Sequence, residues 1–204
     1  MTIYLSGTFR PTLPPEVGLL ATPGNRGKAR QGRIWAADNG RFAAPDKYSD
    51  ASYLKWLAAQ DKKSDCLFAT APDVVGDHHA PLQLSAPMYS PIRQAGYSVA
   101  FVAQNGFDGA PWDSFDALFV GGDDAFKLGA QVPGIVAEAK RRGKWCHMGR
   151  VNSYMRFRLA SVIGCDSVDG NHIAFKPDKY TADVAQWIKQ LAAQPSLDLT
   201  GELR

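Results

Sequence analysis

The sequence lacks any long apolar run. No stretch of it approaches the roughly 20 residues that a membrane-spanning helix needs. Its first residues, 1–6, also lack the basic segment followed by an apolar segment that marks a secretory signal. We therefore expect a cytosolic (cytoplasmic) protein with no membrane partner.

Cysteine is scarce, and no CxxC pair is present. The three cysteines, Cys66, Cys146 and Cys165, lie within or beside apolar runs. This placement favours reduced, buried thiols over a structural zinc site.

One short segment combines an acid with two histidines, Asp77, His78 and His79. It could in principle bind a metal, but no third ligand follows at the spacing of a zinc site. We expect no metal and no cofactor.

Repeats, low-complexity tracts and breaks in composition are absent from the 204 residues. An apolar content of 45% and a charged content of 21% are ordinary for a globular protein. The sequence therefore predicts a single domain spanning residues 1–204, large enough for a substantial core and small for a full eight-stranded barrel.

Short apolar runs recur along the chain, and most of them end in acidic, amide or glycine residues. The runs cover residues 3–6, 17–21, 33–37, 66–71, 98–103, 117–120, 145–150 and 164–170. Short apolar runs bounded by turn residues are typical of buried parallel strands. Helical patterns separate most of them, which predicts a compact, irregular (β/α) barrel of the TIM type. An open doubly wound sheet is the second choice.

Five segments have helical patterns. We expect helices over residues 49–62, capped by Ser49; 78–96, broken or irregular at its prolines; 123–142, interrupted near Pro133–Gly134 and closed by Gly143; 153–163, capped by Asn152; and 181–193, capped by Thr181.

The last strand-like run contains two acids, Asp166 and Asp169. Residues three apart on a strand point to opposite faces, so we expect Asp166 to anchor structure and Asp169 to reach the barrel rim. A second rim carboxylate, Asp38 or Asp73, would complete the pair that glycosyl chemistry uses. Capping and salt bridges are the competing roles for all of these acids.

Basic residues cluster in two places. Arg26, Lys28 and Arg30 lie in a glycine-rich segment without an acid, and Arg150 belongs to a second cluster with Arg156 and Arg158. Such loops suit a polyphosphate backbone. The alternative is an ordinary solvated loop.

Six motifs follow one another in the order of a known family. They are Asp38-Asn39-Gly40-Arg41-Phe42, Ala71-Pro72-Asp73, Gln104-Asn105-Gly106, Gly121-Gly122, His147-Met148-Gly149, and Gly164-Cys165-Asp166-Ser167-Val168-Asp169. Together they resemble the tRNA-guanine transglycosylase superfamily, and especially its short DNA-acting, DpdA-like relatives that handle 7-deazaguanine bases. The resemblance covers residues 33–170.

The resemblance implies a role for each matching residue. Asp169 falls at the position of the nucleophile that attacks C1′, and Asp38 at that of the second catalytic aspartate. The base-binding positions are Asp73, Gln104, the backbone amides of Gly121 and Gly122, and, at the end of the histidine motif, Met148 and Gly149. Arg26, Lys28, Arg30 and Arg150 are expected to contact the nucleic-acid backbone.

The sequence also departs from the family. No cysteine follows Cys165, so we expect no zinc-bearing subdomain and a DNA rather than a tRNA substrate. Arg41 replaces the second glycine of the first motif, which changes the shape of the pocket. We expect an enzyme that flips a modified base out of DNA and cleaves its N-glycosidic bond, leaving an abasic site. The alternatives are exchange with a free 7-deazaguanine base and a non-catalytic nucleic-acid-binding barrel.

Overall fold

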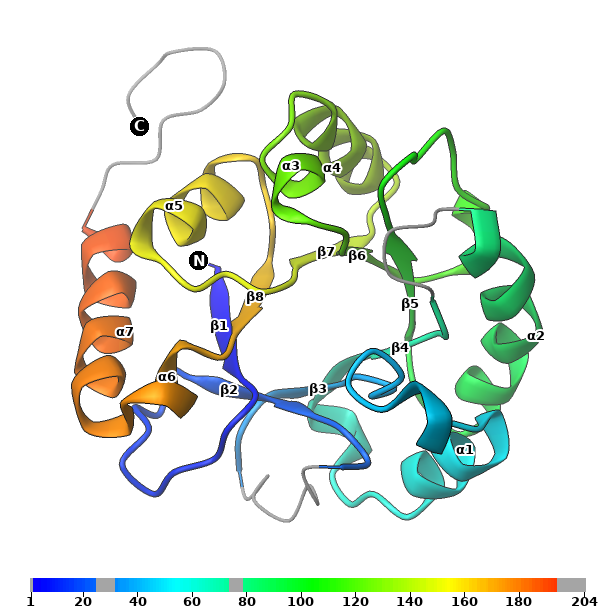
Figure 1. Ribbon diagram of the computed structural model, residues 1–204, viewed down its shortest axis with the longest axis horizontal. Coiled ribbons are helices and arrows are strands. Elements are labelled where there is room, and N and C mark those ends of the chain that lie inside the picture. The colour runs from blue at the N-terminus through cyan, green and yellow to red at the C-terminus, as the bar shows by residue number, and fades with distance from the viewer. Residues whose placement is uncertain (1, 25–31, 74–78, 194–204) are drawn as a thin grey trace.

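A computed structural model describes residues 2–24, 32–73 and 79–193. In these segments eight parallel strands close into a barrel, because each strand pairs with its successor and the last pairs with the first (Figure 1). The strands are β1 (Ile3–Ser6), β2 (Gly18–Ala21), β3 (Trp35–Ala37), β4 (Cys66–Thr70), β5 (Val99–Ala103), β6 (Ala117–Val120), β7 (Trp145–Met148) and β8 (Ser167–Gly170). The expected TIM-like barrel is confirmed. A register shift between β3 and β4 makes it irregular.

Alternate strand residues divide between two hydrophobic clusters. The smaller cluster fills the barrel interior with Leu5, Leu20, Ala36, Phe68, Ala100, Val102, Ala117 and Phe119. Their strand neighbours, such as Tyr4, Phe101 and Leu118, belong to the larger core that the helices cover. This alternation is what the two-residue period of a strand dictates.

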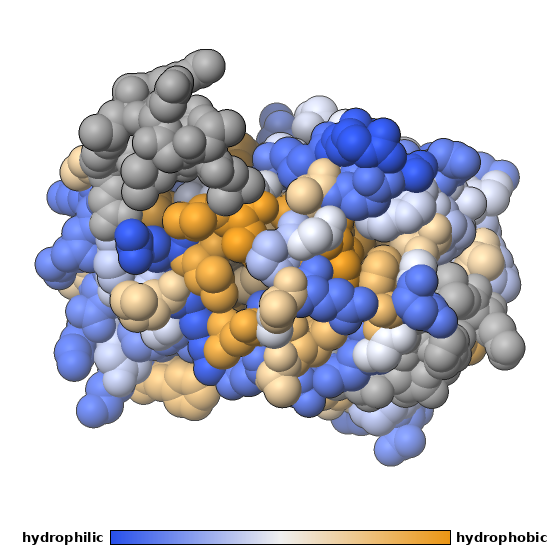
Figure 2. Space-filling view, turned by 90° about the horizontal axis from the view of Figure 1, so that it is seen from above, coloured by the Kyte–Doolittle hydropathy of each residue, from blue (hydrophilic) through white to orange (hydrophobic). Residues whose placement is uncertain are grey.

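The helices surround the barrel (Figure 1). They are α1 (Asp50–Ala58), α2 (His79–Gln94), α3 (Asp124–Lys127), α4 (Gln131–Arg141), α5 (Tyr154–Val162), α6 (His172–Phe175) and α7 (Pro177–Ala192), with 3₁₀ turns at Pro45–Lys47, Lys63–Asp65 and Trp112–Ser114. The side of the molecule seen in Figure 2 is largely hydrophilic, with one gathering of hydrophobic side chains. No helix of the described segments has the length and apolar character to cross a membrane.

Two expectations about prolines are wrong. Helix α2 runs without a break through Pro87 and Pro91, because burial of Met88 and Ile92 against the barrel holds it together. The interruption expected near Pro133 falls at residues 128–130 instead. Pro133 lies in the first turn of α4, where a backbone N–H has no partner within the helix.

Caps were predicted with mixed success. Ser49 caps α1 by accepting a hydrogen bond from the Ser52 amide, as expected. Ser153, and not Asn152, caps α5. Thr181 is buried inside α7, which begins earlier, at Pro177.

Candidate active site

A single cavity at the carboxyl ends of the strands collects most of the candidate residues. It is lined by Asp38, Asn39, Phe42, Thr70, Asp73, Val102, Gln104, Phe119, Gly121, Gly122, Lys127, Gly149, Arg150 and Asp169. Because all the strands are parallel, residues at their carboxyl ends meet at one rim even though they are far apart in sequence. Eight of these fourteen residues are site residues predicted from the sequence.

Asp169 lies on the inner side of β8 and is 7% exposed. Its Oδ1 lies 3.0 Å from His147 Nε2, and its Oδ2 lies 3.4 Å from the Arg150 backbone nitrogen, which donates to it. These partners stabilise a negative charge on Asp169 and fix its orientation.

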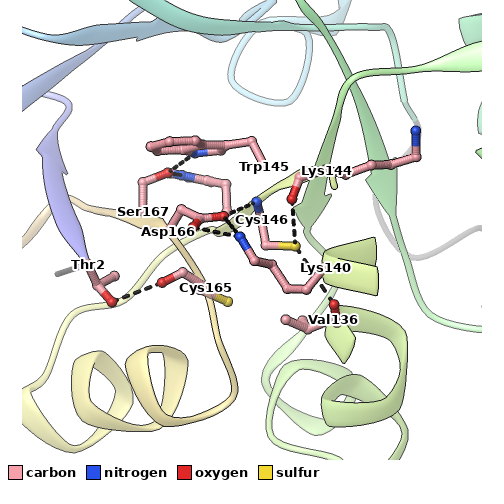
Figure 3. Close-up of polar contacts among 10 residues, drawn as sticks. Thr2, Val136, Lys140, Lys144, Trp145, Cys146, Cys165, Asp166 and Ser167 are labelled. Atoms are coloured by element: carbon pink, nitrogen blue, oxygen red, sulfur yellow. Dashed lines mark hydrogen bonds and ion pairs between the residues drawn. The ribbon is translucent and has the colours of Figure 1, made fainter. Parts of the chain in front are cut away.

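Asp166 has the opposite environment, as the strand period predicts. Its carboxylate accepts two hydrogen bonds of 2.7 Å from Lys140 Nζ and one of 2.8 Å from the Cys146 backbone nitrogen (Figure 3). It therefore joins α4 to β7 and takes no part in the cavity.

A buried chain of hydrogen bonds leads from Trp145 through Ser167 and His147 to Asp169. Trp145 Nε1 donates to Ser167 Oγ at 2.8 Å (Figure 3), and Ser167 Oγ lies 2.8 Å from His147 Nδ1. Because the indole can only donate, the serine hydroxyl proton remains available for His147 Nδ1. When the hydroxyl donates to Nδ1, the tautomer with its proton on Nε2 is the one that can donate to Asp169. The histidine is fully buried.

Asp38 follows β3 and is half-buried. Its Oδ1 accepts a hydrogen bond of 2.6 Å from the Gly40 amide. Burial, the largest cause, together with the charges of Asp169 and Asp73, raises the pKa of Asp38 from 3.8 to about 6, whereas the Gly40 hydrogen bond and Arg150 oppose the shift. A carboxyl group that holds its proton this close to neutral pH can act as a general acid.

Asp73 and Gln104 form a pair on the cavity wall. Gln104 Nε2 donates to Asp73 Oδ2 at 2.6 Å, and Gln104 is 1% exposed. Burial raises the pKa of Asp73, against the hydrogen bonds from Gln104 and Asn39. The pair presents fixed polar atoms of both kinds to whatever occupies the cavity.

Three glycines of the cavity wall lie too close to neighbouring residues of the protein to carry a side chain. A Cβ on Gly121 would lie 2.8 Å from Val102 Cγ1, and Gly122 has a φ of +72° that favours glycine. A Cβ on Gly149 would lie 2.7 Å from the Phe119 ring and 3.3 Å from Asp169 Oδ1. The amide of Gly121 is already bound to the Ala103 carbonyl at 2.9 Å, so the expected contact of this amide with a base is not available.

Met148 does not line the cavity. It is 1% exposed and packs in the core beneath the helices, because its neighbour His147 takes the inward position on β7. The strand period therefore contradicts a direct contact between the Met148 side chain and a base.

Two cations and an aromatic ring lie at the cavity. The Arg150 guanidinium lies 4.2 Å from the centre of the exposed Phe42 ring, and Lys127 is 5% exposed. Arg26, Lys28 and Arg30 lie outside the described residues.

Metal-ligating residues do not cluster in the described segments, where no group of three His, Cys, Asp or Glu side chains could hold an ion. Asp77 and His78 lie outside these segments. Cys146 and Cys165 are free and buried, as expected, and burial raises the pKa of the Cys146 thiol to about 12.

Among the functional residues that are not predicted from the sequence are Lys127 in the cavity, and His147 and Ser167 beside Asp169. His147 and Ser167 belong to motifs that the sequence shows. Their contact, however, depends on the pairing of β7 with β8, which places His147 beside Ser167. Lys127 gave no signal, because a single lysine in a helical segment is usually on the surface.

No family model and no curated protein matches this chain. Among solved structures, the PaMucR phosphodiesterase in complex with c-di-GMP is 15% identical over 72% of this chain, with a TM-score of 0.46. The Bacillus subtilis YkuI protein, with an EAL domain and in complex with c-di-GMP and calcium, is 16% identical over 80% of the chain, with a TM-score of 0.46. Tryptophan synthase from M. tuberculosis is 11% identical over 87% of the chain and 79% of its own, with a TM-score of 0.48.

The chain spans 62% and 45% of the lengths of the first two proteins. At these identities and scores the likenesses carry no argument about chemistry. The pairing of its own strands identifies the chain as a closed eight-stranded (β/α) barrel.

Proposed function

We propose that this protein is an enzyme that cleaves the N-glycosidic bond between a modified nucleobase and deoxyribose in DNA, leaving an abasic site. The observation that carries the proposal is the contrast between two carboxyl groups in one cavity. Asp169 is held by donors that favour its anion, whereas the pKa of Asp38 is raised to about 6. Glycosyl chemistry requires two acids with different roles, and the different surroundings of these two carboxyl groups fit that division.

The base occupies the cavity after it is flipped out of the helix. Asp73 and Gln104 contact its polar edge, and the glycine wall at Gly121–Gly122 lies against its face. Phe42 at the opening offers a ring on which a base can stack.

Asp169 Oδ2 attacks C1′ while the base departs, because Oδ1 is occupied by His147. Asp38 in its acid form protonates the leaving base and, once ionised, activates the water that releases the sugar from Asp169. Arg150 contacts a flanking phosphate.

The order of six motifs that resembles the tRNA-guanine transglycosylase superfamily supports this proposal, since all six contribute residues to the same cavity wall. The same carboxylate pair serves base exchange, in which a free 7-deazaguanine replaces water. The half-buried, solvent-touching position of Asp38 favours water as the acceptor.

The test uses DNA that contains natural, 7-deazaguanine or hypermodified bases, incubated with the protein and then treated with alkali. Strand breaks at one type of base, without added free base, are the expected result. Intact strands that take up a labelled free deazapurine would establish base exchange instead. Protein that binds DNA and produces neither result would be a non-catalytic binding barrel, and the proposal would be wrong.

A further inference from the structure

Lys127 lines the cavity but has no role in the proposed cleavage of the glycosidic bond. It is the last residue of α3, which follows β6, and its side chain lines the same cavity as Asp38 and Asp169. Its side chain is 5% exposed, which is rare for lysine. A buried cation beside a reaction centre requires an explanation.

The surroundings of Lys127 hold its amine in place without neutralising it fully. Nζ donates to the Gly149 carbonyl at 3.1 Å and lies 3.5 Å from Asp124 Oδ1. Asp124 is more than half exposed and is shared with Arg156, which binds it through two hydrogen bonds of 3.1 and 2.6 Å. The negative charge that faces Lys127 is therefore weakened by solvent and by a competing cation.

This environment makes the Lys127 amine easier to deprotonate. Burial lowers the pKa of Lys127, and the neighbouring charges of Arg150 and Arg156 lower it further, whereas Asp124 opposes the shift. An uncharged lysine amine is a nucleophile towards carbonyl carbon, and it is activated in the same way in enzymes that form Schiff bases.

We propose that Lys127 gives this protein a second activity, cleavage of the DNA strand at an abasic site through an imine. The proposal rests on the proposed function for its natural substrate, because removal of a base produces the abasic site in the same cavity. An abasic deoxyribose opens to a free aldehyde at C1′, which is the group that a lysine amine attacks.

In the first step the Lys127 nitrogen bonds to C1′, and the aldehyde oxygen leaves as water, which gives a C1′=N imine. In the second step a cavity carboxylate, Asp38 or Asp169, takes a proton from C2′. The electron pair of that C–H bond forms the C2′=C3′ double bond, and the C3′–O bond breaks with the 3′ phosphate as the leaving group. Water then hydrolyses the imine and restores the amine, so that no oxidant or reductant is consumed.

The experiment uses an oligonucleotide with one abasic site made beforehand, so that it does not depend on base removal. The protein is incubated with it in the presence of sodium borohydride, which reduces the imine to a stable secondary amine. We expect a covalent protein–DNA adduct on a denaturing gel. Peptide mapping of the wild-type adduct by mass spectrometry should place the link on Lys127.

Two variants serve as matched comparisons. Lys127→Arg keeps the positive charge but cannot form the imine, and should lower the adduct yield at least about tenfold. Lys189→Arg changes an exposed lysine of α7 and should leave the yield unchanged. No adduct, or a wild-type adduct that maps to another amine, overturns the proposal, and this mapping decides the matter even if Lys127→Arg fails to fold.

The outcome also separates the two activities. Base release without an adduct on preformed abasic DNA would leave the proposed function standing and remove the role of Lys127. An adduct on Lys127 without base release from any DNA would leave the strand-cleaving activity standing and contradict the proposed glycosidic chemistry.

Discussion

Strand β8 and the residue before it carry aspartates with different roles on the two sides of the barrel wall. On the outer side, Asp166 is tied to Lys140 and to the Cys146 amide, and it joins a helix to the barrel. On the inner side, Asp169 lies among other acids and is held through His147. Paired acids stabilise a fold, whereas acids gathered in one cavity repel one another and are available for chemistry. The comparison predicts opposite effects on stability and activity for the two sides.

The largest difference should come from Asp169→Asn. This change keeps the shape of the side chain but removes the charge that stabilises the developing cation at C1′. We expect the single-turnover rate of base release to fall at least about 10²–10³-fold. DNA affinity, measured by fluorescence anisotropy, should stay within about threefold of the wild type, because phosphate contacts dominate it. A large loss of affinity with an unchanged rate would assign Asp169 to binding.

The second difference concerns the free energy of unfolding, which ionised Asp38 lowers. Its pKa in the folded protein is about 6, above the ordinary 3.8. The folded state therefore binds the proton more tightly, and stability falls as the pH rises from about 4 through 6. Above pH 6 the cost is about 1–3 kcal/mol after allowance for solvent contact.

Asp38→Asn removes this cost, so the variant should be more stable than the wild type at pH 8 and close to it at pH 4. Urea unfolding at both pH values measures the difference. A variant that gains nothing at pH 8 would show that Asp38 is not destabilised in the folded protein. Rates that require the acid form of Asp38 should decline in the wild type above a pH of about 6.

The outer acid should show the reverse pattern. Asp166→Asn loses the ion pair with Lys140 and weakens the bond to the Cys146 amide, which should lower stability by about 1–2 kcal/mol. Catalysis by the folded variant should be unchanged. Chemical denaturation together with a rate measured well below the melting temperature separates the two quantities, and a reduced rate in fully folded protein would contradict the division between the two sides.

The smallest expected effect concerns the hydrogen bond between Ser167 and His147, which orients His147 towards Asp169. Ser167→Ala removes the hydroxyl that directs the His147 proton to Nε2, so the other tautomer becomes accessible and Asp169 loses its donor for part of the time. We expect a fall in rate of about tenfold with little change in KM. The imidazole nitrogen shifts in an NMR spectrum should report the Nε2–H form in the wild type and a mixture in the variant. Identical spectra would mean that Ser167 does not set the tautomer.

The local features of the two sides, namely the strands and the faces on which their residues lie, can be predicted from the sequence. Apolar runs bounded by turn residues predicted all eight strands, and the two-residue period separated Asp166 from Asp169. The same period, applied to β7, would have directed His147 inward and Met148 outward. The family resemblance instead places Met148 in the site through its position in a motif, and a motif gives the position of a residue in the chain but not the face of the strand.

The remainder depends on contacts between segments that are distant in sequence. Ser167 supports His147 only because β7 and β8 pair in one register. Lys127 enters the cavity because the turn after β6 places α3 over the barrel rim, and no pattern within the helix records this position. The continuous helix through Pro87 and Pro91 likewise depends on packing against the barrel, which outweighs the local preference of proline.

The most direct test of the account is the free base released from modified DNA, measured by mass spectrometry for the wild type, Asp166→Asn and Asp169→Asn at equal concentrations of folded protein. The account predicts that the wild type and Asp166→Asn release one type of base at similar rates and that Asp169→Asn releases almost none. Turnover by Asp169→Asn close to that of the wild type would contradict the assignment of the chemistry to the inner side of the barrel.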